Sequence, residues 1–255
     1  MTEPQRITSR DNPLLKRLRL LARDNTAHRK LGQVWLEGDH LCRALLARGL
    51  QPALAVFCES NWPLALDGYS FSAAKIVIIS DALMRDISGL ESAASMGFVV
   101  DLPVPEAVEP LAPTVVLDRV QDAGNVGSIL RSASAFGYTQ VLAIKGTAAL
   151  WSAKVLRAGM GAHFGLRLME GLSPSDVAGL RVPVLVTSSH QGEWVHRAAL
   201  PWPCAWVMGH EGQGVSTDIL SGAVQAIRIA QPGGEESLNV AAAAAICLHA
   251  SAAKP

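Results

Sequence analysis

Residues 115–137, VVLDRVQDAGNVGSILRSASAFG, decide the fold of the C-terminal part of the chain. The apolar run Val115–Asp118 predicts a strand, and a polar loop through Gly124 leads from it into a helix that we expect Asn125 to cap. Arg131 follows six residues after Asn125, which is about 9 Å along the helix axis and on a different face of the helix. Taken alone, the segment fits two interpretations equally well: a capped helix with a surface arginine, or part of a binding site.

Strand-like runs recur downstream of this segment. They are Val141–Ile144, Pro183–Thr187, Ala205–Met208 and Ala226–Ile229, and helical stretches separate them. This alternation predicts an α/β domain with a mainly parallel sheet covered by helices. Ligands of such sheets usually bind at the carboxyl ends of the strands.

A second, smaller α/β domain is predicted upstream. Asn12 and Pro13 are typical of a helix start, since Asn caps free backbone N–H groups and proline is tolerated at the first helical position. The other predicted elements are an apolar face at Leu14, Leu18 and Leu21, helices at Asp39–Gly49 (apolar at Leu41, Leu45 and Leu46) and Ala82–Ile87, and strands at Ala53–Phe57, Ile76–Ile79 and Gly97–Val100. Residues 101–113, DLPVPEAVEPLAP, combine four prolines with three acidic residues, a composition typical of a semi-rigid linker. We therefore expect domains at residues 1–100 and 114–255.

The composition excludes several classes of protein. With 255 residues, 49% of them hydrophobic and 17% charged, the chain can bury sizeable cores. The apolar run Val240–Leu248 is about half of the roughly 20 residues that a membrane span needs, and the N-terminus is charged, so we expect neither a membrane span nor a secretory signal. The four cysteines show no CxxC spacing, which favours reduced thiols in the cytoplasm, and the histidines form no HExxH pattern, so we expect no metal site.

The first thirty residues are basic, although the whole chain has a formal net charge of zero. Eight Lys and Arg residues stand against three acidic ones, so 8 − 3 = +5. The plain interpretation is a solvated helix face, and the functional one is contact with nucleic-acid phosphates. The candidate contacts are Arg6, Arg10, Lys16, Arg17 and Arg19.

A second loop, AWVMGHEGQGVS at residues 205–216, leads from a hydrophobic strand into three glycines and a glutamate. Glycines let a ligand approach the backbone closely. The spacing matches neither a Walker motif nor a dinucleotide fingerprint. A tight strand-to-helix turn therefore stays open as the alternative to a ligand site.

A third loop lies in AIRIAQPGGEESLNVAAAAAICLHA, residues 226–250. A Pro-Gly-Gly turn is followed by Ser237, Leu238 and Asn239, which open an alanine-rich helix. Taken alone, Ser237 and Asn239 would be helix caps. The small side chains suit a helix that packs closely, as a core element or at a subunit interface.

Together and in this order, the three segments resemble the SpoU (TrmH) family of the SPOUT methyltransferases. The matching residues are Asn125, Gly127, Arg131 and Gly137 in the first motif, Gly209, Glu211 and Gly214 in the second, and Ser237, Leu238 and Asn239 in the third. The N-terminal stretch resembles the L30e-like α/β domain that binds the substrate in this family. The resemblance thus covers nearly the whole chain.

The resemblance implies an enzyme that transfers a methyl group from S-adenosylmethionine to a ribose 2′-oxygen of RNA. It further implies a C-terminal domain with a deep trefoil knot, a homodimer, and RNA contacts at the basic N-terminal residues. The implied catalytic residues are Arg131, Asn125, Glu211, Ser237 and Asn239. The implied cofactor-binding residues are Thr187, Gly209, Ile229 and Leu238.

Roles for these residues follow from the chemistry of the implied reaction. A guanidinium is a poor proton acceptor at neutral pH, so Arg131 suits a clamp on phosphate or a stabiliser of the developing oxyanion. Asn125 would orient the ribose or Arg131, and Glu211 would organise the second loop or face the sulfonium. Ser237 and Asn239 would bridge loop and substrate.

Three positions depart from the family pattern. Ala123 stands where proline is common, His210 where Asn is common, and Gly159 where serine is common. Ribosomal RNA is the favoured substrate, with tRNA as the alternative. Two rival functions are a non-catalytic RNA-binding assembly factor and a nucleotide-using metabolic enzyme, and the missing phosphate motifs count against the second.

Overall fold

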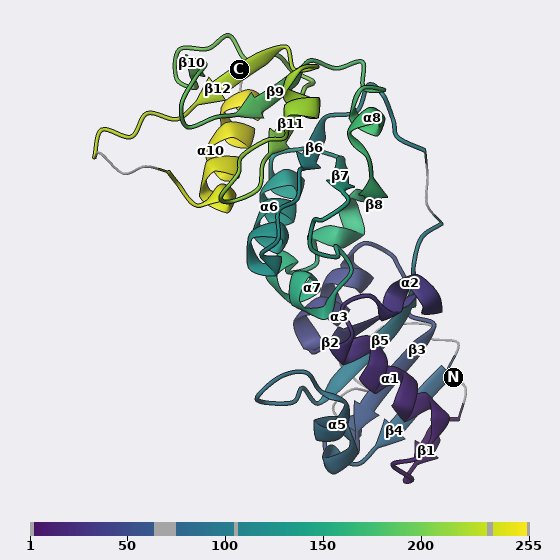
Figure 1. The fold of residues 1–255 in the computed structure, drawn as a ribbon. Helices are drawn as coiled ribbons and strands as arrows, with labels where there is room; N and C mark the ends of the chain where they lie inside the picture. The colour runs from purple at the N-terminus through teal and green to yellow at the C-terminus, as the bar shows by residue number, and fades with distance from the viewer. Residues whose placement is uncertain (1–2, 64–74, 105–106, 234–236, 254–255) are drawn as a thin grey trace. The chain divides into compact units, whose positions relative to one another are not determined.

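The computed structural model describes residues 3–63, 75–104, 107–233 and 237–253. The chain forms two compact units, Met1–Val104 with Trp151–Phe164, and Pro105–Leu150 with Gly165–Pro255 (Figure 1). The excursion Trp151–Phe164 belongs by its packing to the N-terminal unit, which the sequence did not predict. Its helix α7 (Ala153–Gly159) supplies the buried Leu156 to that unit's core.

The N-terminal unit is built on a mixed sheet. In the described residues its strand order is β1-β4-β3-β5-β2, and β5 runs antiparallel to β2 and β3. The strands are β1 (Gln5–Ile7), β2 (Gln33–Glu37), β3 (Leu54–Cys58), β4 (Lys75–Ile79) and β5 (Met96–Asp101), and the helices are α1 (Pro13–Arg23), α2 (Ala27–Leu31), α3 (Asp39–Ala47) and α5 (Asp81–Ile87). The strands and helices predicted here are confirmed, while β1, β2 and α2 were not predicted.

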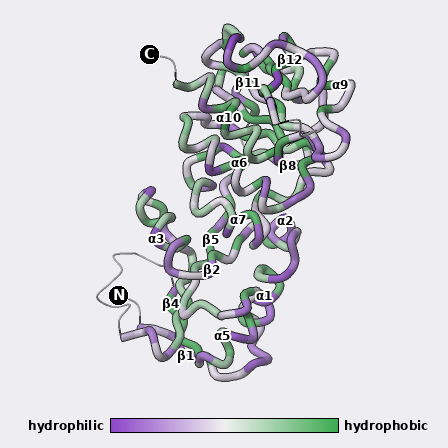
Figure 2. The backbone as a smooth tube through the Cα atoms, turned by 90° about the vertical axis from the view of Figure 1, so that its left-hand side faces the viewer, coloured by the Kyte–Doolittle hydropathy of each residue, from purple (hydrophilic) through white to green (hydrophobic). Residues whose placement is uncertain are grey.

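Helix α1 begins as its sequence predicts. The Asn12 side chain accepts a hydrogen bond from the N–H of Leu14 at 2.9 Å, and Pro13 is the first helical residue. Hydrophilic and hydrophobic residues alternate along the helix in Figure 2. Leu15 lies in the buried row with Leu18 and Leu21. Leu14 is only partly buried and packs at the edge of the same apolar face.

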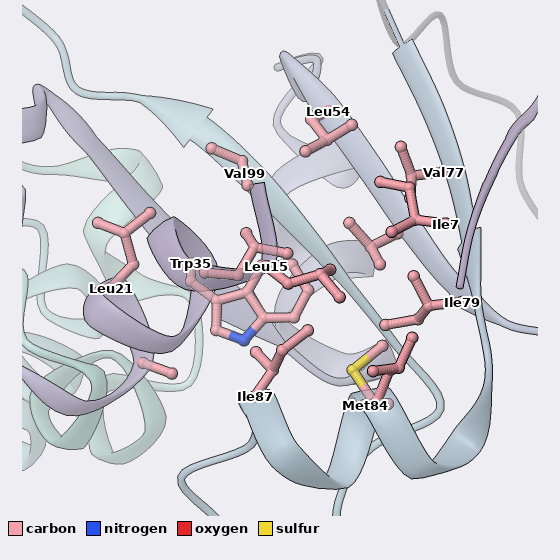
Figure 3. Packing of buried hydrophobic residues seen from close by; sticks show 14 of the residues in the cluster. Ile7, Leu15, Leu21, Trp35, Leu54, Val77, Ile79, Met84, Ile87 and Val99 are labelled. Atoms are coloured by element: carbon pink, nitrogen blue, oxygen red, sulfur yellow. The ribbon is translucent and has the colours of Figure 1, made fainter. Parts of the chain in front are cut away.

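Both faces of the N-terminal sheet are covered. Alternate residues of β3 enter different clusters: Val56 lies in the one that α1 and α5 complete, and Phe57 in the one that α3 completes. Figure 3 shows Leu15, Trp35 and Ile87 gathered in the first cluster.

The C-terminal unit has a wholly parallel sheet, as predicted. Its order in the described residues is β10-β12-β9-β11-β6-β7-β8. The strands are β6 (Thr114–Leu117), β7 (Gln140–Ile144), β8 (Arg167–Leu172), β9 (Val184–Thr187), β10 (Glu193–Trp194), β11 (Ala205–Met208) and β12 (Gln225–Arg228). Five of them match predicted runs, and β8 and β10 were missed. Strand β8 carries Arg167 and Glu170 and has a register shift, so it lacks a clean apolar run.

Helices cover the two faces of this sheet. Helix α6 (Ala123–Ala135) packs beside α10 (Val240–Ala252), as Figure 1 shows. The Trp206 indole N–H donates to the Ser251 hydroxyl at 2.8 Å and ties α10 to β11. The short helices α8 (Pro174–Val177) and α9 (Thr217–Leu220) contribute to the core on the other face. Among the described residues, no helix has the length and apolarity to cross a membrane.

Candidate active site

Helix α6 is capped by Asp122, and the predicted cap at Asn125 is wrong. The Asp122 carboxylate accepts a hydrogen bond from the N–H of Asn125 at 2.7 Å, and Asp122 has an extended backbone. Ala123 and Gly124 already belong to the helix, so Asn125 is its third residue. Because Asp122 caps the helix, the Asn125 carboxamide takes no part in capping and can bind other side chains.

The three loops meet in a chain of polar side chains. The Asn125 Nδ2 donates to Glu211 Oε1 at 3.2 Å, and Asn239 Nδ2 donates to Asn125 Oδ1 at 2.9 Å. Asn239 also caps α10, since its Oδ1 accepts from the N–H groups of Ala241 and Ala242. One residue from each motif thus joins the helix starts of α6 and α10 to the second loop.

Glu211 also binds the backbone of the first loop. Its carboxylate accepts from the N–H groups of Gln121 and Asp122, each at 3.3 Å. Burial works to raise the pKa of Glu211, but the hydrogen bonds from its own N–H, from Asn125 and from these two backbone groups hold that pKa below its usual value. Glu211 is therefore a carboxylate at neutral pH, able to face a cation.

The second loop, Gly209–Val215, is closed tightly on itself. His210 and Gly214 exchange backbone hydrogen bonds of 3.1 and 2.8 Å. A Cβ added at Gly209 would lie 2.3 Å from the backbone carbon of Gly214 and 2.4 Å from the backbone nitrogen of Val215. Only glycine fits at this position, because any side chain would collide with the backbone of the same loop.

An ion pair braces the far end of this loop. Asp118, at the end of β6, is buried, and it accepts from Arg119 Nε at 2.9 Å and from the N–H of Ser216 at 2.6 Å. Arg119 donates onward to Gln213 Oε1 at 2.9 Å. The hydrogen bond that Arg119 donates to Asp118 raises the pKa of Arg119, and burial opposes this shift without outweighing it. The sequence analysis did not single out this pair.

A pocket of about 330 Å³ lies where these loops converge. It opens at the carboxyl ends of β9, β11 and β12, as expected for a parallel sheet. Its lining residues are Thr187, Ser188, Ser189, Gly209, His210, Glu211, Gly214, Ile227, Ile229, Gln231, Ser237, Leu238, Asn239, Val240 and Ala243.

The pocket brings together the four residues expected to bind the cofactor, namely Thr187, Gly209, Ile229 and Leu238. Of the five residues expected to be catalytic, Glu211, Ser237 and Asn239 line it, and Asn125 reaches it through hydrogen bonds to two of them. Arg131 lies two turns along α6, is exposed, and is not among the lining residues.

Three polar lining residues were not singled out from the sequence. Ser188 and Ser189 directly follow β9, so the strand-end rule that selected Thr187 could have found them. Gln231 carries a buried Oε1 that has no hydrogen-bond partner among the residues that the structure describes. Such an acceptor at a pocket wall fits a ligand that brings a hydroxyl or amine donor.

Four of the five candidate RNA-contacting residues take part in ion pairs. Arg10 and Arg19 each hold the Asp86 carboxylate at 2.6 Å, and Arg23 donates to the Asp86 carbonyl at 2.8 Å. The hydrogen bonds from Arg10 and then Arg19 lower the pKa of Asp86. The remaining pairs are Arg6 with Glu59 and Lys16 with Asp11. Arg17 has intermediate exposure.

No cluster of three or more His, Cys, Asp or Glu residues that could hold a metal ion occurs in the described part of the chain. All four cysteines are buried and outside any disulfide bond, and burial raises the pKa of two of them, Cys58 and Cys247, to about 12. These thiols are therefore protonated at neutral pH and unreactive.

The fold and the three joined loops define a class of α/β methyltransferases. The chain belongs to the SpoU rRNA methylase family, whose sequence profile matches residues 112–249. This confirms the resemblance inferred from the three motifs.

Known relatives agree with this assignment. The chain is 29% identical to the 23S rRNA (guanosine(2553)-2'-O)-methyltransferase RlmP of Bacillus subtilis over 218 residues, 84% of this chain and 86% of that enzyme. A putative RNA methyltransferase of the TrmH family from Porphyromonas gingivalis has a similar structure, with 28% identity, a TM-score of 0.80, and coverage of 93% of this chain and 96% of that one. An AdoMet-bound rRNA methyltransferase from Sinorhizobium meliloti shares the fold, with a TM-score of 0.83, 23% identity and coverage of 97% of both chains.

Proposed function

We propose that this protein transfers a methyl group from S-adenosylmethionine to a ribose 2′-oxygen of ribosomal RNA. The observation that carries the proposal is the hydrogen-bonded chain Glu211–Asn125–Asn239, which joins three separate loops around one pocket. Family membership and the 23S rRNA 2′-O-methyltransferase named among the relatives support the same reaction. Transfer RNA is the alternative substrate.

The pocket residues fit S-adenosylmethionine. Ile227, Ile229 and Leu238 offer apolar walls for an adenine ring, and the buried Gln231 Oε1 offers an acceptor for its amine or a ribose hydroxyl. Gly209 lines the pocket, so its backbone groups can contact the ligand. When bound, the cofactor supplies an activated methyl group on a sulfonium.

The contribution of the protein to this reaction is mainly positioning and charge. Glu211 is ionised and lines the pocket, so it can face a cation or fix the second loop. Asn125 and Asn239 hold each other in one orientation and can present their remaining polar atoms to a ribose. Ser237, exposed beside them, can contact the substrate.

Arg131 has the part of an electrostatic clamp. Its guanidinium stays protonated at neutral pH and suits a phosphate or a developing oxyanion better than a proton. Its exposed place on α6, outside the pocket lining, supports contact with RNA rather than with the cofactor.

The finer features of this assignment are also proposals. We assign the C-terminal domain to residues 114–255 with a deep trefoil knot, and the L30e-like RNA-binding domain to residues 1–100, with a linker at 101–113. The exposed side of Arg10, 74% accessible while it pairs with Asp86, supports phosphate contact there. Ile246, exposed on the alanine-rich α10, supports a homodimer interface. The four cysteines outside any disulfide bond support a cytoplasmic protein.

The proposal is tested by mapping ribose methylation in rRNA and tRNA from cells with and without the gene. A single rRNA ribose that loses its methyl group, and regains it in vitro with the purified protein, is the expected result. A change confined to tRNA would identify tRNA as the substrate in place of rRNA. No change at any ribose would indicate that the protein binds RNA without catalysing methyl transfer. Arg131→Ala should abolish methyl transfer while S-adenosylmethionine binding persists; full activity of this variant would refute the role given to Arg131.

A further inference from the structure

His210 holds the second loop in shape with its side chain. The imidazole Nδ1 accepts hydrogen bonds from the N–H of Gly212 at 3.0 Å and from the N–H of Gln213 at 3.2 Å. The backbone of the same residue exchanges two hydrogen bonds with Gly214. His210 also lines the pocket. One residue therefore closes the loop from both backbone and side chain.

We propose that His210 is a positioning residue whose neutral imidazole keeps the cofactor pocket in its binding shape, and that protonation of this imidazole weakens cofactor binding. The proposal rests on the proposed function, since it takes the pocket to bind S-adenosylmethionine. Asn is common at this position in the family, whereas this chain has His210. An Asn carboxamide oxygen can accept from the backbone two residues on, in the manner of an Asx turn, and it does not titrate.

The chemistry of imidazole gives the direction of the effect. A neutral ring has one acceptor nitrogen, whereas both nitrogens of a protonated ring are donors. Protonation of His210 would turn a donor towards two backbone N–H groups and remove both of their hydrogen bonds. It would also add a positive charge to a pocket that receives a sulfonium. Histidine side chains ordinarily change charge between about pH 5 and 8, so affinity is expected to fall as the pH falls through that range.

Other charged groups also contact this loop. Glu211, the next residue, has a pKa held below its usual value by the hydrogen bonds described above. At the other end, the buried Asp118 pairs with Arg119, whose pKa is raised. Asp122 faces Glu211 through its backbone N–H and turns its carboxylate to the N-terminus of α6. His210 is therefore the group through which we expect this loop to respond near neutral pH.

The test is isothermal titration of the full-length protein with S-adenosylmethionine at pH 7.5 and 5.5. For the wild type we expect the Kd to rise about tenfold at the lower pH, the loss corresponding to about two neutral hydrogen bonds. His210→Asn should bind equally well at both values. His210→Phe, which keeps a ring but has no acceptor, should bind weakly at both. His40→Asn, at an exposed histidine of the N-terminal unit, is the matched control and should keep the wild-type pH dependence.

Titration with S-adenosylhomocysteine, which lacks the sulfonium charge, separates the loss of the loop hydrogen bonds from the repulsion between a protonated imidazole and the sulfonium. A pH dependence that persists with this ligand supports the loss of the loop hydrogen bonds, and one that disappears overturns that part of the proposal. Equal wild-type affinity at both pH values, or the same slope in His210→Asn, overturns the role of His210 while leaving the pocket assignment intact. No binding by the wild type at pH 7.5 would instead overturn the pocket assignment itself.

Discussion

Asn125 is the central member of the side-chain chain that joins the three loops, so its removal tests the site most directly. Asn125→Ala deletes the donor to Glu211 and the acceptor for Asn239 in one step. The helix should survive, because Asp122 caps α6 through the backbone N–H of residue 125, which alanine retains. The substitution therefore acts on the contacts between loops and not on the fold of either.

The size of the effect can be worked from the two bonds. A hydrogen bond to a charged group contributes about 1.5–3 kcal/mol and a neutral one about 0.5–1.5 kcal/mol. Both bonds of Asn125 are solvent-exposed, which favours the low end of each range. Their sum is about 2 kcal/mol, and part of it is recovered by water. We expect kcat/KM for methyl transfer to fall about tenfold, which corresponds to about 1.4 kcal/mol.

The assay is single-turnover methyl transfer to rRNA, combined with a double-mutant cycle. Asn239→Ala removes both the donor to Asn125 and the cap of α10, whereas Asn239→Ser retains a capping oxygen and loses only the donor. Asn125→Ala and Asn239→Ser should be less than additive, with a coupling of at least about 0.5 kcal/mol. Strictly additive effects, or an Asn125→Ala rate within twofold of wild type, would refute the idea that the hydrogen bonds between Glu211, Asn125 and Asn239 assemble the site.

Two further predictions concern glycines that face other atoms closely. Gly209→Ala should weaken S-adenosylmethionine binding by about tenfold or more, because its Cβ would lie 2.3 Å from the Gly214 backbone; Gly212→Ala is the control, since its Cβ would meet only the His210 ring at 3.9 Å. Equal affinities of the two variants in calorimetry would contradict the fit described for the second loop. Gly97→Ala should destabilise the N-terminal unit by about 1–3 kcal/mol in urea unfolding, because its Cβ would lie 2.3 Å from the Trp35 ring. Trp35→Leu in the same background should recover part of this loss, and no recovery would locate the strain elsewhere.

The fold was largely predictable where apolar runs are short, clean and bounded by turns. Strands β6, β7 and β11 are buried at every residue, and apart from Thr114 and Gln140 at the first positions of β6 and β7 they are continuous apolar runs, as is typical of a parallel sheet. Strand β10 has two residues and lies at the sheet edge, too short to leave a pattern. The membership of Trp151–Phe164 in the N-terminal unit depends on contacts far apart in sequence, such as that of Leu156 with its core, which periodicity does not encode.

The sequence indicated many of the residues that the structure brings together at the pocket, but not the contacts between them. The motifs and the strand-end rule selected Thr187, Gly209 and Leu238, which all line one pocket. The wrong cap at Asn125 shows the limit of local reasoning. Asp and Asn are both favourable cap residues, so the local sequence does not distinguish Asp122 from Asn125. In the structure Asp122 is the cap, and the Asn125 side chain binds Glu211, 86 residues away.

The strained backbone at Arg119 indicates what holds this arrangement together. Its φ of 62° is unusual for a residue with a side chain and costs on the order of 1 kcal/mol. The surroundings offset this cost, because the Arg119 N–H donates to the Thr147 hydroxyl and its guanidinium binds both Asp118 and Gln213. Without that conformation the guanidinium would not join the end of β6 to the second loop. The second loop is thus fixed at its Gln213–Ser216 end by the Asp118–Arg119 ion pair. Its other end, with His210 and Glu211, lines the pocket, where we expect it to respond to pH.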